Sequence, residues 1–190
     1  WNKMVIFIQR NQINMNNPRY SFYLILFLSL ILGSQNGFCH SFSSNNSASD
    51  SLALVAFYNA TNGSNWTNND NWLVAQQPIS NWYGVTIDGS GCVVCLDFDG
   101  LDDCLNTPEG MGNNLTGTIP AALGSLSNLT DLYLGDNQLN GTIPNEIANL
   151  SNLRTLNLDG NQINGTIPPG IGNLINLVRL NLGENELSGA

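Results

Sequence analysis

Residues 126–149 read LSNLTDLYLGDNQLNGTIPNEIAN, and residues 150–173 repeat this phrase as LSNLRTLNLDGNQINGTIPPGIGN. A third copy begins at Leu174, so that the period is 24 residues. A fixed period of this length is typical of a solenoid, in which each repeat is one structural unit that stacks on the next. The repeats therefore predict an extended binding surface rather than an enclosed catalytic pocket.

Each copy begins with a leucine pattern that is typical of a strand. In the first copy Leu132 and Leu134 alternate with polar residues, which indicates a strand with one buried face. Asn137 follows, and we expect its side-chain amide to bond to backbone groups of the turn, because buried amides need partners. The sequence Gly-Thr-Ile-Pro at 141–144 is then expected to turn the chain along the far side, with Ile147 in the core beneath it.

An earlier repeat is interrupted by an insertion. Val93, Leu96 and Phe98 match the strand positions of the later copies, and residues 113–120 match their second half. Residues 101–112 lie between the two halves as extra sequence. Insertions in solenoids emerge as loops on one face, which is often the binding face.

The segment before the repeats combines a helical pattern with aromatic residues. Residues 49–63 read as a helix that Ser49 or Asp50 can cap. One face is expected to carry Leu52, Val55, Ala56 and Asn59, with Leu54, Phe57 and Tyr58 beside it. The next stretch is irregular, and its aromatic residues are expected to cover the open end of the stack: Trp66, Trp72, Trp82 and Tyr83. Carbohydrate stacking on one tryptophan is the alternative.

The N-terminal region has the order of a secretory signal. Residues 20–33 form a long apolar run that follows Arg19 and precedes a polar stretch. We expect a signal peptide at 15–39, then a linker at 40–49, with residues 1–14 as a possible leader or non-native extension. An uncleaved anchor is the alternative, but the apolar run is shorter than the roughly 20 residues that a membrane span needs.

The charge balance excludes some partners. The chain has 14 acidic residues and five Lys plus Arg, and only two of the basic residues follow the predicted signal. The remainder therefore carries +2 − 14 = −12. Such a surface repels phosphate backbones, so we expect no nucleic-acid binding, whereas cationic partners, neutral sugars or Ca²⁺ are compatible with it.

The repeats resemble plant-type leucine-rich repeats of the form LxxLxxLxLxxNxLxGxIPxxIxxL, and the match covers about residues 93–190. Residues 50–91 look like the N-terminal cap that precedes such repeats. Ile87 stands where plant caps usually have a paired cysteine, so the cap is closer to the form in secreted microbial and protist proteins. The resemblance implies an α/β solenoid: a right-handed leucine-rich-repeat horseshoe with a parallel concave sheet and a helical, Trp-rich N-terminal cap.

The resemblance also implies about four repeats over residues 92–190, the last of them incomplete. The sequence stops at 187–190, where Ile-Pro should come next. We therefore expect this chain to be a fragment of a longer protein.

The concave strand positions are the natural ligand surface of such a solenoid. Strands lie about 4.8 Å apart, so outward side chains of successive repeats form columns. Tyr133 is the only aromatic residue among them, and amphipathic aromatic residues often anchor interfaces. The predicted ligand-binding residues are Asp97, Asp99, Asp131, Tyr133, Thr155, Asn157, Asp159, Arg179 and Asn181.

Three cysteines remain after the predicted cleavage, which indicates one disulfide and one spare thiol. Cys92 and Cys95 would point to opposite faces of a strand and cannot easily bond to each other. We expect a Cys95–Cys104 bridge, with Cys92–Cys104 as the alternative. No metal site and no cofactor are expected, because Cys92-x-x-Cys95 lacks a second ligand pair and the only histidine is His40. A calcium site among Asp97, Asp99, Asp102 and Asp103 is a weaker reading than solvated acids.

Nine Asn-x-Ser/Thr sequons occur in the chain. In a eukaryotic secretory pathway several of them could carry glycans. The predicted sites are Asn59, Asn65, Asn114, Asn128, Asn140 and Asn164. The alternative is that the repeated Asn-Gly-Thr phrase generates sequons by itself, in an asparagine-rich chain.

A secreted or cell-surface recognition module, rather than an enzyme, follows from these features. Its partner could be a protein, a peptide or a polysaccharide, and membrane attachment would require a downstream span. Two alternatives are the N-terminal ectodomain of a receptor-like kinase and an enzyme inhibitor that resembles polygalacturonase-inhibiting proteins. Ice binding, suggested by the recurrence of Thr118, Thr142 and Thr166, ranks last because these threonines are expected in turns.

Overall fold

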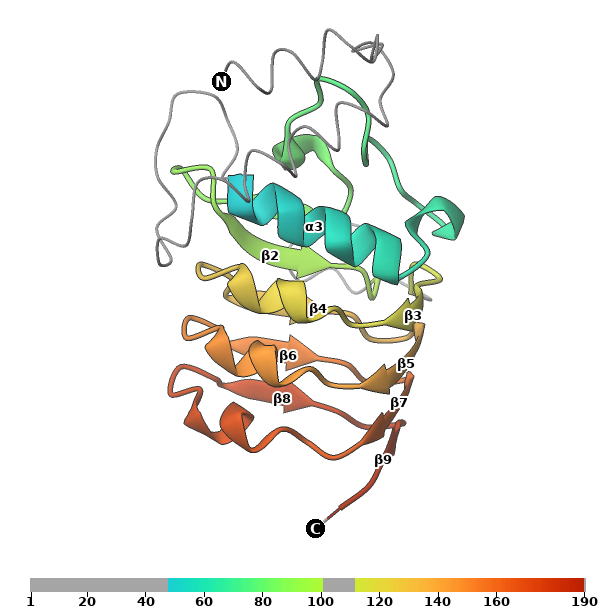
Figure 1. Cartoon of the computed structure of the whole chain (residues 1–190), viewed down its shortest axis with the longest axis vertical. Helices are drawn as coiled ribbons and strands as arrows, with labels where there is room; N and C mark the ends of the chain where they lie inside the picture. Colours follow the sequence, from blue (N-terminus) through green and yellow to red (C-terminus); the bar gives the residue numbers. More distant parts are fainter. Residues whose placement is uncertain (1–47, 101–111, 190) are drawn as a thin grey trace, which may run out of the picture. The chain divides into compact units, whose positions relative to one another are not determined.

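The computed structural model describes residues 48–100 and 112–189, which belong to one compact unit spanning residues 39–190. The predicted signal, the linker up to residue 47 and the inserted residues 101–111 lie outside the described residues. Figure 1 shows helix α3 (Ala48–Ala60) above a stack of coils that all run in the same sense. None of the described helices is long and apolar enough to cross a membrane.

The strand segments of the repeats form one sheet, here called the first sheet, in the order β1-β2-β4-β6-β8. Strands β2, β4, β6 and β8 are parallel and in register. This arrangement confirms the predicted leucine-rich-repeat solenoid with a parallel sheet. The strands are β1 (Val85–Ile87), β2 (Val93–Asp97), β4 (Asp131–Tyr133), β6 (Thr155–Asn157) and β8 (Arg179–Asn181).

Strand β1 differs from the others because it pairs with β2 in the antiparallel sense. Its register shifts between Thr86 and Ile87, so the strand is both short and irregular. The sequence did not predict this strand. Its position at the end of the strand order places it at one edge of the first sheet.

A second parallel sheet, which was not predicted from the sequence, runs along one flank of the stack in the order β3-β5-β7-β9, at the right-hand side of Figure 1. Thr142, expected in a turn, is the last residue of β5. The strands are β3 (Thr116–Thr118), β5 (Gln138–Thr142), β7 (Gln162–Gly165) and β9 (Glu186–Leu187). Short 3-10 helices follow at η3 (Ala121–Ser125), η4 (Asn145–Asn149) and η5 (Pro169–Asn173).

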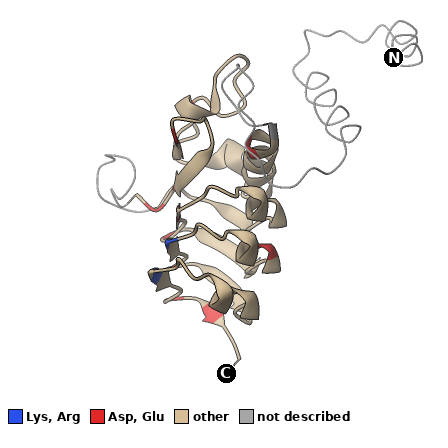
Figure 2. Cartoon of the chain, turned by 90° about the vertical axis from the view of Figure 1, so that its left-hand side faces the viewer, with Lys and Arg blue, Asp and Glu red and all other residues tan. Residues whose placement is uncertain are grey.

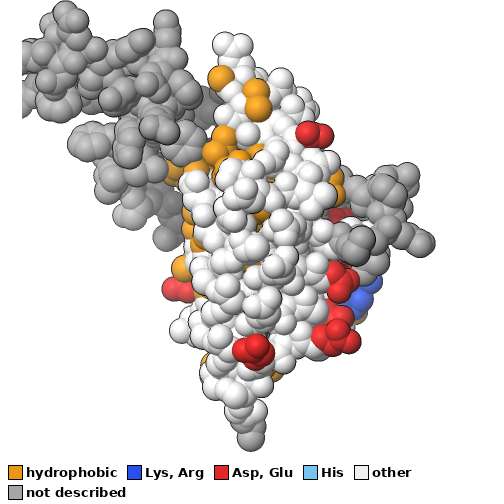
Figure 3. Space-filling model, turned by 90° about the vertical axis from the view of Figure 1, so that its right-hand side faces the viewer, with side chains coloured by type: hydrophobic (Ala, Val, Ile, Leu, Met, Phe, Trp, Pro, Cys, Tyr) orange, Lys and Arg blue, Asp and Glu red, His pale blue; other side chains and the backbone are white. Residues whose placement is uncertain are grey.

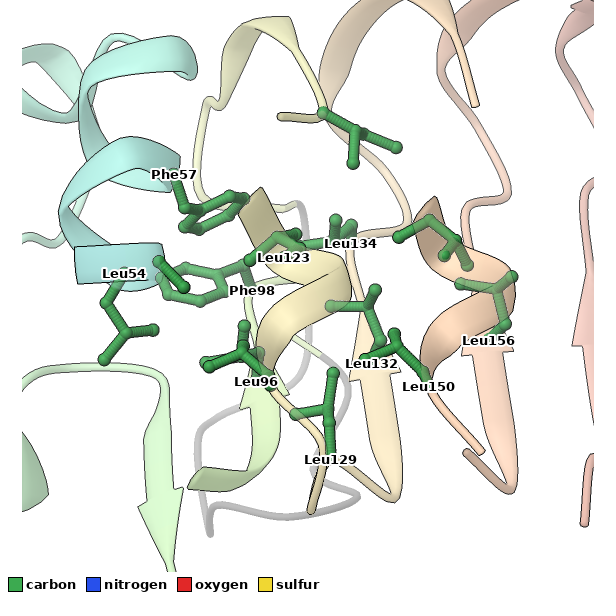
Figure 4. Close-up of a cluster of buried hydrophobic side chains, with 14 of the residues drawn as sticks. Leu54, Phe57, Leu96, Phe98, Leu123, Leu129, Leu132, Leu134, Leu150 and Leu156 are labelled. Carbon is green, nitrogen blue, oxygen red and sulfur yellow. The ribbon is translucent and has the colours of Figure 1, made fainter. Parts of the chain in front are cut away.

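The repeat leucines form a continuous core between the two sheets and the 3-10 helices. Leu96, Leu132 and Leu156 occupy equivalent places in successive strands and are fully buried. Figure 4 shows their side chains entering the same core as Leu123 and Leu150 from the 3-10 side. Each coil can bury its apolar side only against its neighbours, so the contacts between adjacent coils stabilise the solenoid.

A row of buried asparagines joins successive coils, as expected. The Oδ1 atom of Asn137 accepts a hydrogen bond from the N–H of Leu115 at 2.9 Å, and Oδ1 of Asn161 accepts one from Leu139 at 2.9 Å. Asn185 repeats the contact with Ile163. The prediction that these amides bond to backbone groups of the turn is confirmed.

Helix α3 begins at Ala48, inside the predicted linker, and buries a different face from the predicted one. Ala53, Leu54 and Phe57 are buried, whereas Asn59 is exposed. The prediction of the buried face was wrong because the helix has apolar residues on several sides. The spacing of its apolar residues therefore does not identify a single buried face. The other members of the predicted face, Leu52, Val55 and Ala56, are only half-buried.

The tryptophans after the helix are buried and pack on the first repeat. Trp66 lies 5.0 Å from Phe98 between ring centroids, and Phe57 of α3 lies 5.3 Å from the same ring. Trp72 and Trp82 pack on each other at 4.7 Å. These rings therefore lie against the first repeat, and none of the three offers an exposed platform for a sugar. That residues 50–91 form an N-terminal cap stays a prediction.

Candidate binding surfaces

The outward side of the first sheet, here called the concave face, brings seven of the nine predicted ligand residues into two rows, whereas Asp99 and Asp159 follow the ends of β2 and β6. The register places Asp97, Tyr133, Asn157 and Asn181 side by side, one from each parallel strand. A parallel row holds Cys95, Asp131, Thr155 and Arg179. The two rows follow from the 24-residue period, since equivalent residues of successive coils occupy adjacent strands.

Several outward positions of the concave face, most of them on β2 and β4, are not accessible. Tyr133 is only 4% exposed, so the expectation of an exposed aromatic anchor is not met. Asp97 and Asp99 are 3% and 1% exposed, and Thr155 is also buried. The repeat pattern correctly placed these side chains on one face, but it carried no information on what covers that face.

The two buried acids belong to a packed polar cluster rather than to an open site. The Nδ2 atom of Asn157 donates a hydrogen bond to Oδ2 of Asp99 at 2.9 Å. Burial raises the pKa of Tyr83, and the neighbouring carboxylates of Asp97 and Asp99 raise it further. Tyr83 therefore stays neutral beside these acids, as a negative phenolate would be both desolvated and repelled.

The other outward positions are at least partly accessible, and we call them the C-terminal patch. It consists of Asp131, Asn157 and Asp159, which are half-buried, and Arg179 and Asn181, which are exposed. Arg154 is exposed directly before β6. Figure 2 shows the blue of the basic residues along one side of the stack, in its C-terminal half. The patch therefore offers both a cation and carboxylates to a ligand.

Both described cysteines form disulfide bonds, whereas the sequence predicted that one of the cysteines would be a free thiol. Cys92 and Cys95 are both buried and both disulfide-bonded, so neither is the expected spare thiol. Cys104, the predicted partner of Cys95, lies outside the described residues, and the Cys95–Cys104 pairing stays a prediction.

The predicted glycosylation sites differ in accessibility. The exposed asparagines are Asn59, Asn65, Asn114, Asn140 and Asn164. Asn128 is half-buried, and its Nδ2 atom lies 3.4 Å from Oδ2 of Asp88. The pKa of Asp88 is lowered, chiefly by a hydrogen bond from the backbone N–H of Cys92. Within residues 48–100 and 112–189, no group of three or more His, Cys, Asp and Glu side chains could hold a metal ion.

The second sheet presents another surface, here called the second-sheet face. Along β5, exposed Gln138, Asn140 and Thr142 alternate with buried Leu139. The same alternation was visible in the sequence as a period of two, but the adjacent Gly-Thr-Ile-Pro led us to expect a turn. The exposed residues of this face are Thr118, Gln138, Asn140, Thr142, Gln162, Asn164, Thr166 and Glu186.

The comparisons with known proteins agree with this architecture. Residues 111–163 match the family model described as "Leucine rich repeat". No curated protein matches the chain. Among solved structures, a complex entitled PEPR1-AtPEP1 is 27% identical with a TM-score of 0.60, and the match covers 74% of this chain and 18% of that chain.

Two further solved structures are similar over the same region. The leucine-rich-repeat ectodomain of the receptor kinase SOBIR1 from Arabidopsis thaliana is 28% identical, with a TM-score of 0.56, over 76% of this chain and 71% of that chain. A plant ice-binding protein is 27% identical, with a TM-score of 0.63, over 76% of this chain and 43% of that chain. The chain thus spans less than a fifth of the PEPR1 complex chain and less than half of the ice-binding protein.

The strands, the asparagine row and the matched residues lead to the same conclusion. The chain carries leucine-rich repeats, folded into a solenoid that is similar to plant receptor ectodomains.

Proposed function

We propose that this chain is a non-enzymatic, extracellular binding module whose C-terminal patch recognises a protein or peptide. The observation that carries this proposal is the outward row in which Asn157 lies beside Asn181, next to Arg179, with Arg154 exposed directly before β6. A guanidinium beside amides and carboxylates suits backbone and side-chain groups of an extended peptide, and arginine is enriched where interfaces gain most of their energy.

The solved structures support a protein or peptide partner over a polysaccharide. One of them is the PEPR1-AtPEP1 structure, and another is the complex of BIR3 with SERK2, which is 28% identical with a TM-score of 0.57. The receptor-kinase ectodomain SOBIR1 supports the receptor-like alternative and an extracellular location. Stacking of a sugar ring lacks support, because Tyr133 and the described tryptophans are buried.

The test uses selection from a displayed library of random peptides on the full chain. Enriched peptides are expected to lose binding to the double variant Arg179→Ala/Asn181→Ala. The control is Asn145→Ala, which changes an exposed residue of η4 on the far side of the coil. Failure to enrich any peptide, or equal binding of the enriched peptides to the double variant, would overturn the proposal for this patch.

A second candidate function is ice binding. It is favoured by the similarity to a plant ice-binding protein, which has a TM-score of 0.63. It is also favoured by a correction to our expectation: Thr118 and Thr142 lie in strands of a sheet and not in turns. Inhibition of ice recrystallisation by the full chain at micromolar concentration is the expected result, and ordinary crystal growth at saturating protein would reject this candidate.

A further inference from the structure

The second-sheet face has a composition unlike that of the concave face. Its exposed side chains are hydroxyls and amides, and the only charged member in strands β3, β5, β7 and β9 is Glu186 at the sheet edge. Figure 3 views this side and shows a broad area without basic or apolar side chains at its surface, with acidic ones towards its margins. The concave face, in contrast, carries both carboxylates and a guanidinium.

The regularity of this face comes from the pairing of its strands. In the parallel ladder Thr118 lies opposite Asn140, Asn140 lies opposite Gln162, and Thr142 lies opposite Asn164. Outward hydroxyl and amide groups therefore recur from strand to strand at the roughly 4.8 Å spacing of a sheet. Buried Leu139 and Ile163 hold the strands on the core, so the array is fixed by packing.

Glycines set the close contact between neighbouring strands. Gly141 and Gly165 have φ values of 73° and 76°, which favour glycine. A Cβ on Gly141 would lie 3.0 Å from Cγ2 of Thr118, and one on Gly165 would lie 2.9 Å from Cγ2 of Thr142. Each threonine methyl thus fills the space left by the glycine of the next coil, which limits the rotation of its side chain.

We propose that the second-sheet face is the surface that contacts ice, with Asn140 and Thr142 near its centre. This inference rests on ice binding, the second candidate function. Ice is a neutral, periodic lattice of hydrogen-bond donors and acceptors, so it requires an uncharged and regularly spaced partner that loses little side-chain entropy on contact. The face also lacks the aromatic and arginine residues that dominate protein interfaces, which argues against a protein partner here.

The test compares two variants with the same chemical change. Asn140→Arg places a large hydrated charge in the middle of the second-sheet face, and Asn145→Arg places it on η4 in the same coil. Both residues are exposed, so that matching thermal melts are expected for the two variants. The full chain is made without N-glycans and assayed for ice recrystallisation inhibition and for adsorption to a single ice crystal.

The expected result is loss of both ice activities in Asn140→Arg and their retention in Asn145→Arg. If the unmodified chain is inactive, the candidate function itself fails. If the chain is active and Asn140→Arg retains that activity, or if Asn145→Arg loses it equally, the assignment to this face is overturned while ice binding stands. This assignment replaces the glycosylation predicted for Asn140 and Asn164, because glycans at these exposed residues would cover the face. Glycans at both sites in protein from its natural source would overturn the assignment.

Discussion

The carboxylate of Asp50 in helix α3 accepts a hydrogen bond from the backbone N–H of Val93, with 2.9 Å between Oδ2 and N. Both residues are buried, and they lie 43 positions apart in the sequence. The contact joins the first turn of the helix to the first residue of β2. One side chain thereby fixes the N-terminal segment to the start of the solenoid.

Replacement of this carboxylate should destabilise the whole unit. Asp50→Ala leaves the buried N–H of Val93 without its acceptor, and we expect a loss of about 2 kcal/mol in the free energy of unfolding. The measurement is urea denaturation followed by tryptophan fluorescence, as Trp66 and Trp72 are buried beside the helix. The exposed Asp70→Ala is the control, and an equal loss in both variants would contradict this role.

Truncation of an asparagine in the buried row should lower the free energy of unfolding, by an amount that grows with the number of hydrogen bonds removed. Asn161 donates to the carbonyls of Leu134, Leu158 and Asp159 and accepts from Leu139. Asn161→Ala is therefore expected to cost about 3 kcal/mol or more, because several buried backbone groups lose their partner.

The matched control is Asn152→Ala. Asn152 is exposed, and its amide donates to the carbonyl of Ser127 at 2.8 Å. Its loss should cost about 1 kcal/mol or less. Similar destabilisation of the two variants by chemical denaturation would argue that the buried row does not hold the coils together.

The raised pKa of Tyr83 should make the free energy of unfolding decrease at alkaline pH. Its pKa is raised by burial and by Asp97 and Asp99, so the folded state keeps the phenol proton above the pH at which an unfolded tyrosine, with a pKa of about 10, releases it. The unfolded state then binds fewer protons, and stability decreases as pH rises from about 10 towards the folded pKa. Tyr83→Phe should reduce this decrease between pH 9 and about 11, and an unchanged slope would contradict the assignment.

Occupancy of two sequons outside the second-sheet face, Asn59 and Asn128, should follow their accessibility. Asn59 is exposed at the end of α3, whereas the amide of Asn128 faces Asp88 and is half-buried. We expect a glycan at Asn59 and none at Asn128 when the chain passes through a eukaryotic secretory pathway. Glycopeptide mass spectrometry measures both sites in one digest, and full occupancy of Asn128 would contradict the prediction.

Disulfide mapping should find more than one bridge. Cys92 and Cys95 are both bonded; Cys95 lies in β2 and Cys92 directly precedes this strand, so that mutual pairing is unfavourable. If Cys95 pairs with Cys104, the remaining partner for Cys92 in this chain is Cys39. Peptide mapping without reduction should therefore recover Cys39, which would place any signal cleavage before it. A free Cys92 thiol in the mature protein would contradict the predicted pairing of Cys92 with Cys39.

The stack of coils could be predicted from the sequence, because the repeat period itself fixes which residues of successive coils lie side by side. Leu132, Leu134 and Asn137 recur at fixed spacing, so their burial in one copy predicts it in the next. The second sheet was missed because its strands are short and contain glycine, which normally weakens a strand interior. The burial of Tyr133 was missed for a different reason: a repeat pattern shows which face of the sheet a side chain lies on, but not how accessible that face is.

The reversed direction of β1 has a consequence for solubility. A row of parallel strands is a template onto which another molecule could add its own strand, and successive additions would build a fibre. β1 closes one end of the first sheet with a three-residue strand that runs the opposite way and is irregular at Thr86 and Ile87. Because β1 is short, irregular and does not continue the parallel ladder, it is a poor template for an incoming coil, and this edge of the first sheet discourages head-to-tail addition.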